Sequence, residues 1–313
     1  MTQDPIPAIE RLGYTLREAS FLYLVTIHSG YFMRRHFARF LDRVDGAICT
    51  NFLKKAIARR HVRPLNFSQN RYVYHLQAKT IYQLCRVVDS QNRRIKGEAG
   101  LKHRLMTLDY VLDDPEEQFL PSAEKKVEFF VQSLGIPRDV LPQSSLGNSD
   151  RGRFFMDPTP ISIESHEQHN WLVRLAYIDE GAQTIKPFIR FLARYEALLR
   201  KLPAFELVYV ADVDLNFPLA TEEFLRRFPP AGASVLFPHG VDHFLEFARA
   251  RLGWERSGGR VDLAELETLR EGQKLYRAAE HNPLYERLVD GSLTEQKLRG
   301  NSRAGYVLRF PLR

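Results

Sequence analysis

Three short amphipathic segments follow one another closely in the first quarter of the chain, and they are the feature that most limits which fold it can adopt. Each repeats apolar side chains at helical spacing, over residues 15–30, 32–44 and 48–60. The first segment begins with Thr15 and Glu18, a spacing typical of a capping box at a helix N-terminus. Three helices within about fifty residues are typical of a helix-turn-helix module.

A hairpin is predicted directly after the third helix. Residues 62–67 and 71–76 are separated by Ser68, Gln69 and Asn70, and side chains alternate along the second segment. Two such segments around a short polar tip predict an antiparallel β-hairpin. We interpret this hairpin as the wing of an N-terminal winged helix-turn-helix.

Positive charge is concentrated in the same part of the chain. Residues 1–105 contain 19 basic and 7 acidic side chains and have a net charge of +12. Residues 106–313 contain 26 basic and 31 acidic side chains and have a net charge of −5. Because dense Lys and Arg neutralise phosphates, this asymmetry predicts double-stranded DNA as the partner. The alternative is a basic surface that is merely solvated.

The third helix is the expected reader of DNA bases. In the major groove, Asn pairs with adenine and Lys or Arg with guanine, while other basic residues meet phosphates. We expect Lys54 and Lys55 to be exposed, and Arg63 and Arg71, which flank the wing, to lie near the backbone or the minor groove. The candidate DNA-binding residues are Thr50, Asn51, Lys54, Lys55, Arg59, Arg60, Arg63 and Arg71.

The rest of the chain predicts a connector and a second domain, in an α+β protein overall. We expect a winged-helix domain with its following helices over 1–115, a helical connector and linker over 116–152, and an α/β domain over 153–313. Strand-like segments 170–180 and 205–213 flank a long helical pattern. This alternation predicts a mixed sheet covered by helices, with extra helices toward the C-terminus.

The N-terminal motifs resemble those of bacterial replication-relaxation and related mobile-element proteins. The matching residues are Thr15, Arg17, Glu18, Tyr74 and Leu76. Residues 101–112 stand where such proteins carry a His-Leu helix after the wing. The match covers about the first 115 residues. The resemblance implies a regulator of transcription or replication in a mobile element or genomic island, with a restriction-endonuclease-like C-terminal domain.

An active nuclease of this kind needs an acidic residue on one strand and an Asp/Glu-x-Lys motif on the next, because the carboxylates hold a divalent metal. Asp157 takes the first position and Asp179 and Glu180 the second, but the lysine is missing and Lys186 follows one helical turn later. We therefore expect a catalytically silent domain without a cofactor. The alternative is a Mg²⁺-dependent DNA endonuclease that uses Asp157, Asp179, Glu180 and Lys186.

Other features of the sequence limit the class of protein. Cys49 and Cys85 lack the spacing of a disulfide framework or a zinc site, and no segment resembles a signal peptide or a membrane helix. We therefore expect a cytoplasmic protein without a membrane partner. Helix-turn-helix proteins commonly dimerise to meet two half-sites, so a homodimer is one expectation. A further functional alternative is a protein-interaction adaptor that has lost DNA contact.

Overall fold

The computed structural model contains helices and strands throughout and divides into two compact units. The first comprises Met1–Leu202, Glu206–Phe217 and Val307–Arg313, and the second Pro203–Phe205 and Pro218–Tyr306. The structure describes residues 4–68, 71–114, 117–143, 154–155, 158–166, 170–181, 183–228, 239–277, 281–291, 295 and 303–309.

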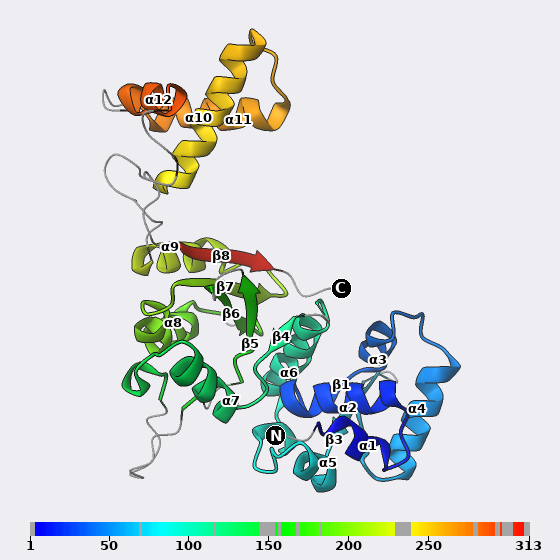
Figure 1. Cartoon of the computed structure of the whole chain (residues 1–313). Helices are drawn as coiled ribbons and strands as arrows, with labels where there is room; N and C mark the ends of the chain where they lie inside the picture. The colour runs from blue at the N-terminus through cyan, green and yellow to red at the C-terminus, as the bar shows by residue number, and fades with distance from the viewer. Residues whose placement is uncertain are drawn as a thin grey trace. The chain divides into compact units, whose positions relative to one another are not determined.

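The first unit begins with the helices and the hairpin expected from the sequence. Thr15 and Glu18 form the predicted capping box: the Thr15 hydroxyl accepts from the Glu18 amide at 3.4 Å, and the Glu18 carboxylate accepts from the Thr15 amide at 2.8 Å. The elements are α1 (Ile6–Glu10), α2 (Leu16–His28), β1 (Tyr31–Phe32), α3 (Arg34–Phe40), α4 (Ala47–Ala58), β2 (Val62–Ser68) and β3 (Arg71–Leu76) (Figure 1).

A two-residue strand that the sequence analysis missed completes a small sheet. β1 pairs antiparallel with β3, with Tyr31 opposite His75, and the strand order is β1-β3-β2. Gly30 makes the preceding turn with a φ of +77°, and a Cβ there would lie 2.0 Å from the carbonyl oxygen of Asn92. Only glycine fits this turn, which starts β1 directly after α2.

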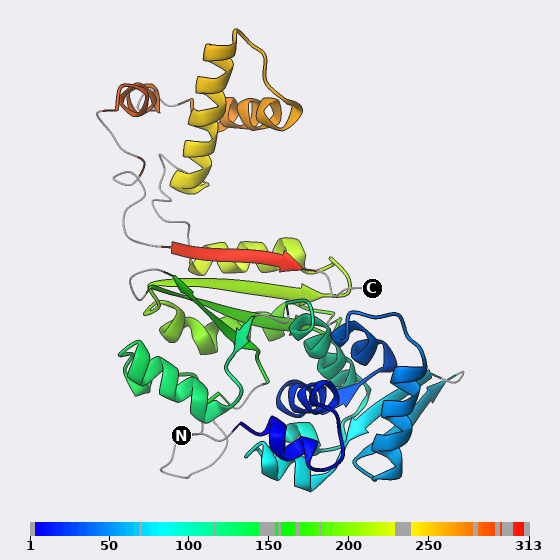
Figure 2. The same ribbon diagram turned by 45° about the vertical axis from the view of Figure 1, so that its right-hand side comes forward.

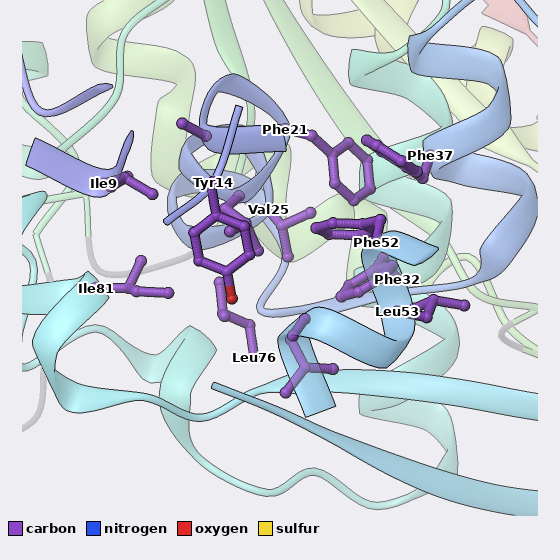
Figure 3. Close-up of a cluster of buried hydrophobic side chains, with 14 of the residues drawn as sticks. Ile9, Tyr14, Phe21, Val25, Phe32, Phe37, Phe52, Leu53, Leu76 and Ile81 are labelled. Atoms are coloured by element: carbon purple, nitrogen blue, oxygen red, sulfur yellow. The ribbon is translucent and has the colours of Figure 1, made fainter. Parts of the chain in front are cut away.

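Four buried phenylalanines hold the helices of this part together (Figure 3). Phe21 of α2, Phe32 of β1, Phe37 of α3 and Phe52 of α4 lie in one cluster, with ring centroids 5.0 Å apart for Phe21 and Phe37 and 4.1 Å for Phe37 and Phe52. Because each ring comes from a different element, their burial fixes the orientation of α4 against α2 and α3.

The helix α6 (Glu98–Val111) joins the N-terminal part to the larger sheet. It follows α5 (Lys79–Leu84) and packs Leu101 against Tyr31 and Val73, while Met106 packs in a cluster with residues of β6 and β7. The boundaries expected near residues 115 and 152 therefore do not separate compact units, since α6 belongs to both cores.

The larger sheet has the strand order β4-β5-β6-β7-β8. β4-β5 and β5-β6 are antiparallel. Along β6 and β7, Arg174 contacts Glu206 and the later Asp179 contacts the later Tyr209, so these two strands run in the same direction and the sheet is mixed. The strands are β4 (Gln118–Phe119), β5 (Ile161–His166), β6 (Asn170–Asp179), β7 (Ala204–Ala211) and β8 (Arg303–Arg309).

Helices accompany this sheet within the first unit. α7 (Ala123–Glu128) begins at Ser122, whose hydroxyl accepts from the Lys125 amide, and a π-helical turn (Phe129–Ser133) continues it. α8 (Lys186–Leu199) connects β6 to β7 and buries Phe188 and Leu192. The connector expected over 116–152 thus begins with the edge strand β4, continues through α7 to Ser133 and adds a 3-10 turn at Arg138–Val140, and its residues 144–152 lie outside the described part.

The second unit is mainly helical. It contains most of α9 (Phe217–Arg227), then α10 (Gly240–Ser257), α11 (Leu263–Leu275) and α12 (His281–Val289). Phe244, Leu269 and Tyr276 form its core. The C-terminal helices expected from the sequence are present, and no described helix combines the length and apolar character that crossing a membrane requires.

Candidate functional site

The outward face of α4 consists of Ala47, Asn51, Lys54 and Ala58, which recur at helical spacing and are all exposed. The inward face carries Cys49, Phe52, Leu53 and Ala56. Among the residues that the structure describes, Lys54 has no hydrogen-bond or ion-pair partner. The alanines allow close approach of the helix backbone, so this face presents one amide and one ammonium group to a partner.

Lys55 differs from the expectation that it is exposed. Its Nζ lies 2.6 Å from Glu18 Oε2, and only 27% of its side chain is exposed. The neighbouring Arg59 is exposed, with its guanidinium 5.5 Å from the ring centroid of Tyr14. Burial raises the pKa of Tyr14 to about 12, so its neutral hydroxyl hydrogen-bonds His61 Nδ1 at 2.8 Å. Lys55 therefore anchors α4 to α2, whereas Arg59 remains accessible.

Thr50 also takes part in an internal contact. Its hydroxyl accepts from Arg34 at 2.8 Å and lies 3.3 Å from the carbonyl of Gly46, and the residue is half-buried. Arg34 at the same time pairs with Asp45 at 2.5 Å. These bonds form a network that fixes the turn between α3 and α4, and the base contact by Thr50 stays a prediction.

The hairpin divides its exposed residues between two faces. Arg63 lies opposite His75, whereas Asn66 lies opposite Tyr72 on the alternate face. That second face includes Tyr74, which stacks on Phe32 of the helical core at 5.4 Å. Asn66 and Tyr72 are exposed and share the helical side of the hairpin, although the sequence analysis named neither.

The remaining basic candidates are placed as follows. Arg60 is exposed just after α4 in a left-handed conformation with a φ of +56°. Arg63 is exposed but belongs to the face of the hairpin away from Tyr74. Arg71 begins β3, and its side chain lies outside the described part. The structure thus brings Asn51 and Lys54 together on one face, with Arg59 and Arg60 at the helix end.

In contrast to α4, α3 directs its basic side chains to carboxylates. Arg35 lies 2.7 Å from Asp109 of α6, and Arg39 pairs with Asp113. The buried His36 accepts from the Met33 amide at Nδ1, so its Nε2 carries the proton and donates to Asp109 at 3.0 Å. Burial lowers the pKa of His36 and keeps the imidazole neutral. α3 is therefore a docking helix for α6.

The candidate catalytic carboxylates meet different partners. Asp179 is buried at the end of β6, where its carboxylate accepts from Tyr209 at 2.5 Å, Asn216 at 3.1 Å and the Gly181 amide at 3.0 Å. Asp157 lies outside the described residues. The three donors satisfy Asp179 as a structural group that holds the ends of β6 and β7 together.

Glu180 points to α6 instead. Its carboxylate lies 3.3 Å from His103 Nδ1, and this hydrogen bond lowers the pKa of Glu180. The lysine near these strand ends is Lys102, also of α6, which pairs with Asp212 at 2.5 Å. Lys186 is exposed at the start of α8. Sequence reasoning missed Lys102 and His103 because they precede the ends of these strands by more than seventy residues.

The polar cluster at the strand ends does not form a metal centre from described side chains. Within the described ranges, no three His, Cys, Asp or Glu residues are grouped so that they could hold a metal ion. Mg²⁺ binding by Asp157, Asp179 and Glu180 stays a prediction, since Asp157 lies outside those ranges. Comparison with protein-family models, curated proteins and solved structures gives no match for this chain.

Proposed function

We propose that the chain binds double-stranded DNA through the outward face of α4, with the β2–β3 hairpin beside it as a wing (Figure 2). The element order from α2 to β3 is helix, strand, helix, helix, strand and strand, and the small sheet has the order β1-β3-β2. This succession supports a winged helix-turn-helix, in which the second helix of the pair reads the major groove.

The observation that carries the proposal is the open pair of Asn51 and Lys54. Both side chains are exposed on one face of α4 between two alanines, and Lys54 has no internal counter-ion among the described residues. An amide and an ammonium group are suited to base edges and phosphates. Arg59 and Arg60 extend this positive surface at the helix end.

In this proposal, the domain that contains the larger sheet has a structural role and is not catalytic. Three antiparallel strands, a crossover helix and a parallel strand are also the arrangement of the restriction-endonuclease-like core that the sequence resembles. The carboxylate of Asp179 accepts hydrogen bonds from Tyr209 and Asn216, and Lys102 forms an ion pair with Asp212. We therefore propose a regulator of transcription or replication in a mobile element, whose nuclease-like domain is catalytically silent.

The test measures binding of the full chain to a fluorescent DNA duplex of mixed sequence by anisotropy, at several salt concentrations between about 50 and about 200 mM. Affinity should fall steeply as salt rises, because bound phosphates release counter-ions. Lys54→Glu should weaken binding and reduce the log–log salt slope by about 1 to 2. Lys201→Glu, at an exposed lysine after α8, makes the same charge change as a control.

Equal losses of affinity in the two variants would contradict a specific role for α4. An affinity that stays flat with salt would instead support the adaptor alternative, in which no phosphate is bound.

The endonuclease alternative has a separate test. Supercoiled DNA is incubated with the protein and Mg²⁺ or Mn²⁺, and nicking is followed by gel electrophoresis. Glu180→Gln is the appropriate variant because Glu180 is only half-buried, whereas Asp179 is part of the buried hydrogen-bond network. We expect no nicking by either protein. Metal-dependent nicking that Glu180→Gln abolishes would establish an enzyme.

A further inference from the structure

A large open cavity of about 1420 Å³ lies within the first unit, away from the outward face of α4. Its walls come from the loop between α5 and α6, from α6 itself and from the segment around α7. Basic side chains on these walls outnumber acidic ones: the basic residues are Arg86, Arg94, Lys96, Arg104, Lys126 and Arg138.

Arg104 is the central observation. It lies on α6, lines the cavity and is only 6% exposed. No carboxylate or other hydrogen-bond acceptor contacts its guanidinium among the residues that the structure describes. Tyr31 and Tyr82 are nearby but form no hydrogen bond with it. Because arginine keeps its charge at all ordinary pH values, burial without a counter-charge is unfavourable.

A second cation, Lys96, lies near Arg104. Burial lowers the pKa of Lys96, and repulsion of its ammonium group by Arg104 and Arg94 lowers it further. The Tyr31 hydroxyl fixes this part of the loop, since it accepts from the Lys96 amide and donates to the Arg94 carbonyl, both at 3.0 Å. These hydrogen bonds hold the loop in place, so Lys96 stays close to the arginines that repel it.

The other wall supplies Lys126, which is 7% exposed and donates to the carbonyl of Thr159 at 2.6 Å. The imidazole of His28 also lines the cavity, and burial lowers its pKa to about 3, so it is neutral there. The acidic lining residues Asp89, Glu124 and Glu128 are all exposed. Arg104 and Lys126 are therefore recessed, whereas these carboxylates lie toward solvent, as do Arg86, Arg94 and Arg138.

We propose that this cavity binds a small anion with two or more phosphate groups, held by Arg104 and Lys96. The planar guanidinium of Arg104 supplies paired donors for phosphate oxygens, and Lys96 supplies a point charge. Because Arg94, Lys96 and Arg104 all line the cavity and Arg94 and Arg104 repel Lys96, a ligand with more negative charge than a single phosphate is favoured, which points to a diphosphate or a longer chain.

The same geometry disfavours the DNA backbone as the occupant. Arg104 and Lys126 are each less than a tenth exposed. Phosphates of a duplex lie on a broad convex surface, and residues that neutralise them are accessible, as Lys54 is on α4. A compact phosphorylated molecule, in contrast, enters a recessed site.

The test titrates inorganic pyrophosphate into the full chain by isothermal calorimetry at constant ionic strength, without DNA. We expect saturable binding to one site per chain. Arg104→Met, which keeps the length of the side chain and removes the charge, should weaken binding at least about 10-fold. Arg17→Met, at an exposed arginine of α2 outside the cavity, should bind as the unaltered protein does.

Lys96→Met provides a second cavity variant if Arg104→Met does not fold, and it should weaken binding in the same direction. The proposal is wrong if pyrophosphate does not bind saturably, or if the folded cavity variants bind it unchanged. It is also wrong if a DNA duplex displaces pyrophosphate from Lys54→Glu protein, because the cavity is then part of a nucleic-acid surface. Since no DNA is present in the first titration, these outcomes are independent of the function proposed for α4.

Discussion

The helices α3 and α4 are neighbours with similar basic sequences, but they use their positive charge in opposite ways. On α3, Arg35 and Arg39 reach Asp109 and Asp113 of α6. On α4, Lys54 points outward without a partner among the described residues, and Lys55 alone pairs internally. The arginines of α3 thus pair with carboxylates of α6, whereas the ammonium group of Lys54 on α4 is available to a ligand.

The contrast teaches that net charge does not measure binding capacity. The +12 of residues 1–105 includes side chains that carboxylates already neutralise, some of them from outside that range. Asp109 and Asp113 belong to the acidic remainder of the sequence but lie against the basic part in the fold. The contacts in the folded chain, and not the net charge, show which basic side chains pair internally and which can bind a partner.

The largest expected effect is a loss of stability when the contacts between α3 and α6 are removed. Asp109→Ala should lower the free energy of unfolding by about 3 kcal/mol, because it removes a buried carboxylate that bonds both Arg35 and His36. Asp45→Ala is the matched control, since its pair with Arg34 is exposed and should contribute less than about 1 kcal/mol. Urea unfolding measures both, and equal losses would contradict a docking role specific to α3.

The pH dependence of stability tests the neutral state of His28, which lies at the end of α2. The folded-state pKa of His28 is lowered to about 3 from the ordinary 6.5, so the unfolded chain binds a proton in a range where the folded chain does not. Stability is therefore present above about pH 6.5 and is lost as pH falls, by about 1.4 kcal/mol per pH unit for this group. Urea unfolding at about pH 7 and about pH 5 should differ by about 2 kcal/mol from this group. His28→Phe should reduce that difference, and an unchanged difference would contradict the assignment.

The adjacent lysines of α4 sharpen the comparison within one helix. Lys54→Met should weaken DNA binding by about 10-fold and leave stability nearly unchanged, because its ammonium group is exposed. Lys55→Met should instead lower the free energy of unfolding by about 1 kcal/mol, since it breaks the half-buried pair with Glu18. Anisotropy titrations and urea unfolding of both variants measure the difference. Interchanged effects would reverse the roles assigned to the two residues.

The smallest expected effect concerns sequence preference. Asn51→Ala should change the relative affinities for different duplexes by about 1 kcal/mol, or about 5-fold, while binding to a mixed-sequence duplex changes less. Selection of duplexes from a random pool, followed by competition titrations, measures this. A uniform loss across all duplexes would indicate that Asn51 contacts phosphates instead of bases.

Local signals predicted much of the fold. The spacing of Thr15 and Glu18 predicted the start of α2, because a cap depends on residues only three positions apart. The alternation in residues 71–76 predicted β3 for the same reason. In contrast, β1 and β4 have two residues each, which is too short for a periodic pattern, and their partners alone define them.

The candidate site was predicted less completely. Asn51 and Lys54 are exposed as helical spacing predicts. Thr50 and Lys55 were also expected on the outer surface, but Arg34 and Glu18 bind them. Nothing in the local pattern of α4 indicates these partners, because they lie on other elements. The pairing of α6 with the carboxylates at the ends of β6 and β7 could not be predicted either, because these partners also lie on different elements.

The double contact of Glu18 has a consequence for protein engineering. One carboxylate oxygen both closes the first turn of α2 and binds Lys55. If α4 is moved onto another protein, the new host therefore needs an acidic residue at the place of Glu18, because Lys55 otherwise loses its partner. Libraries that vary the outward face of α4 should randomise positions 51 and 54 and keep Glu18 and Lys55 constant.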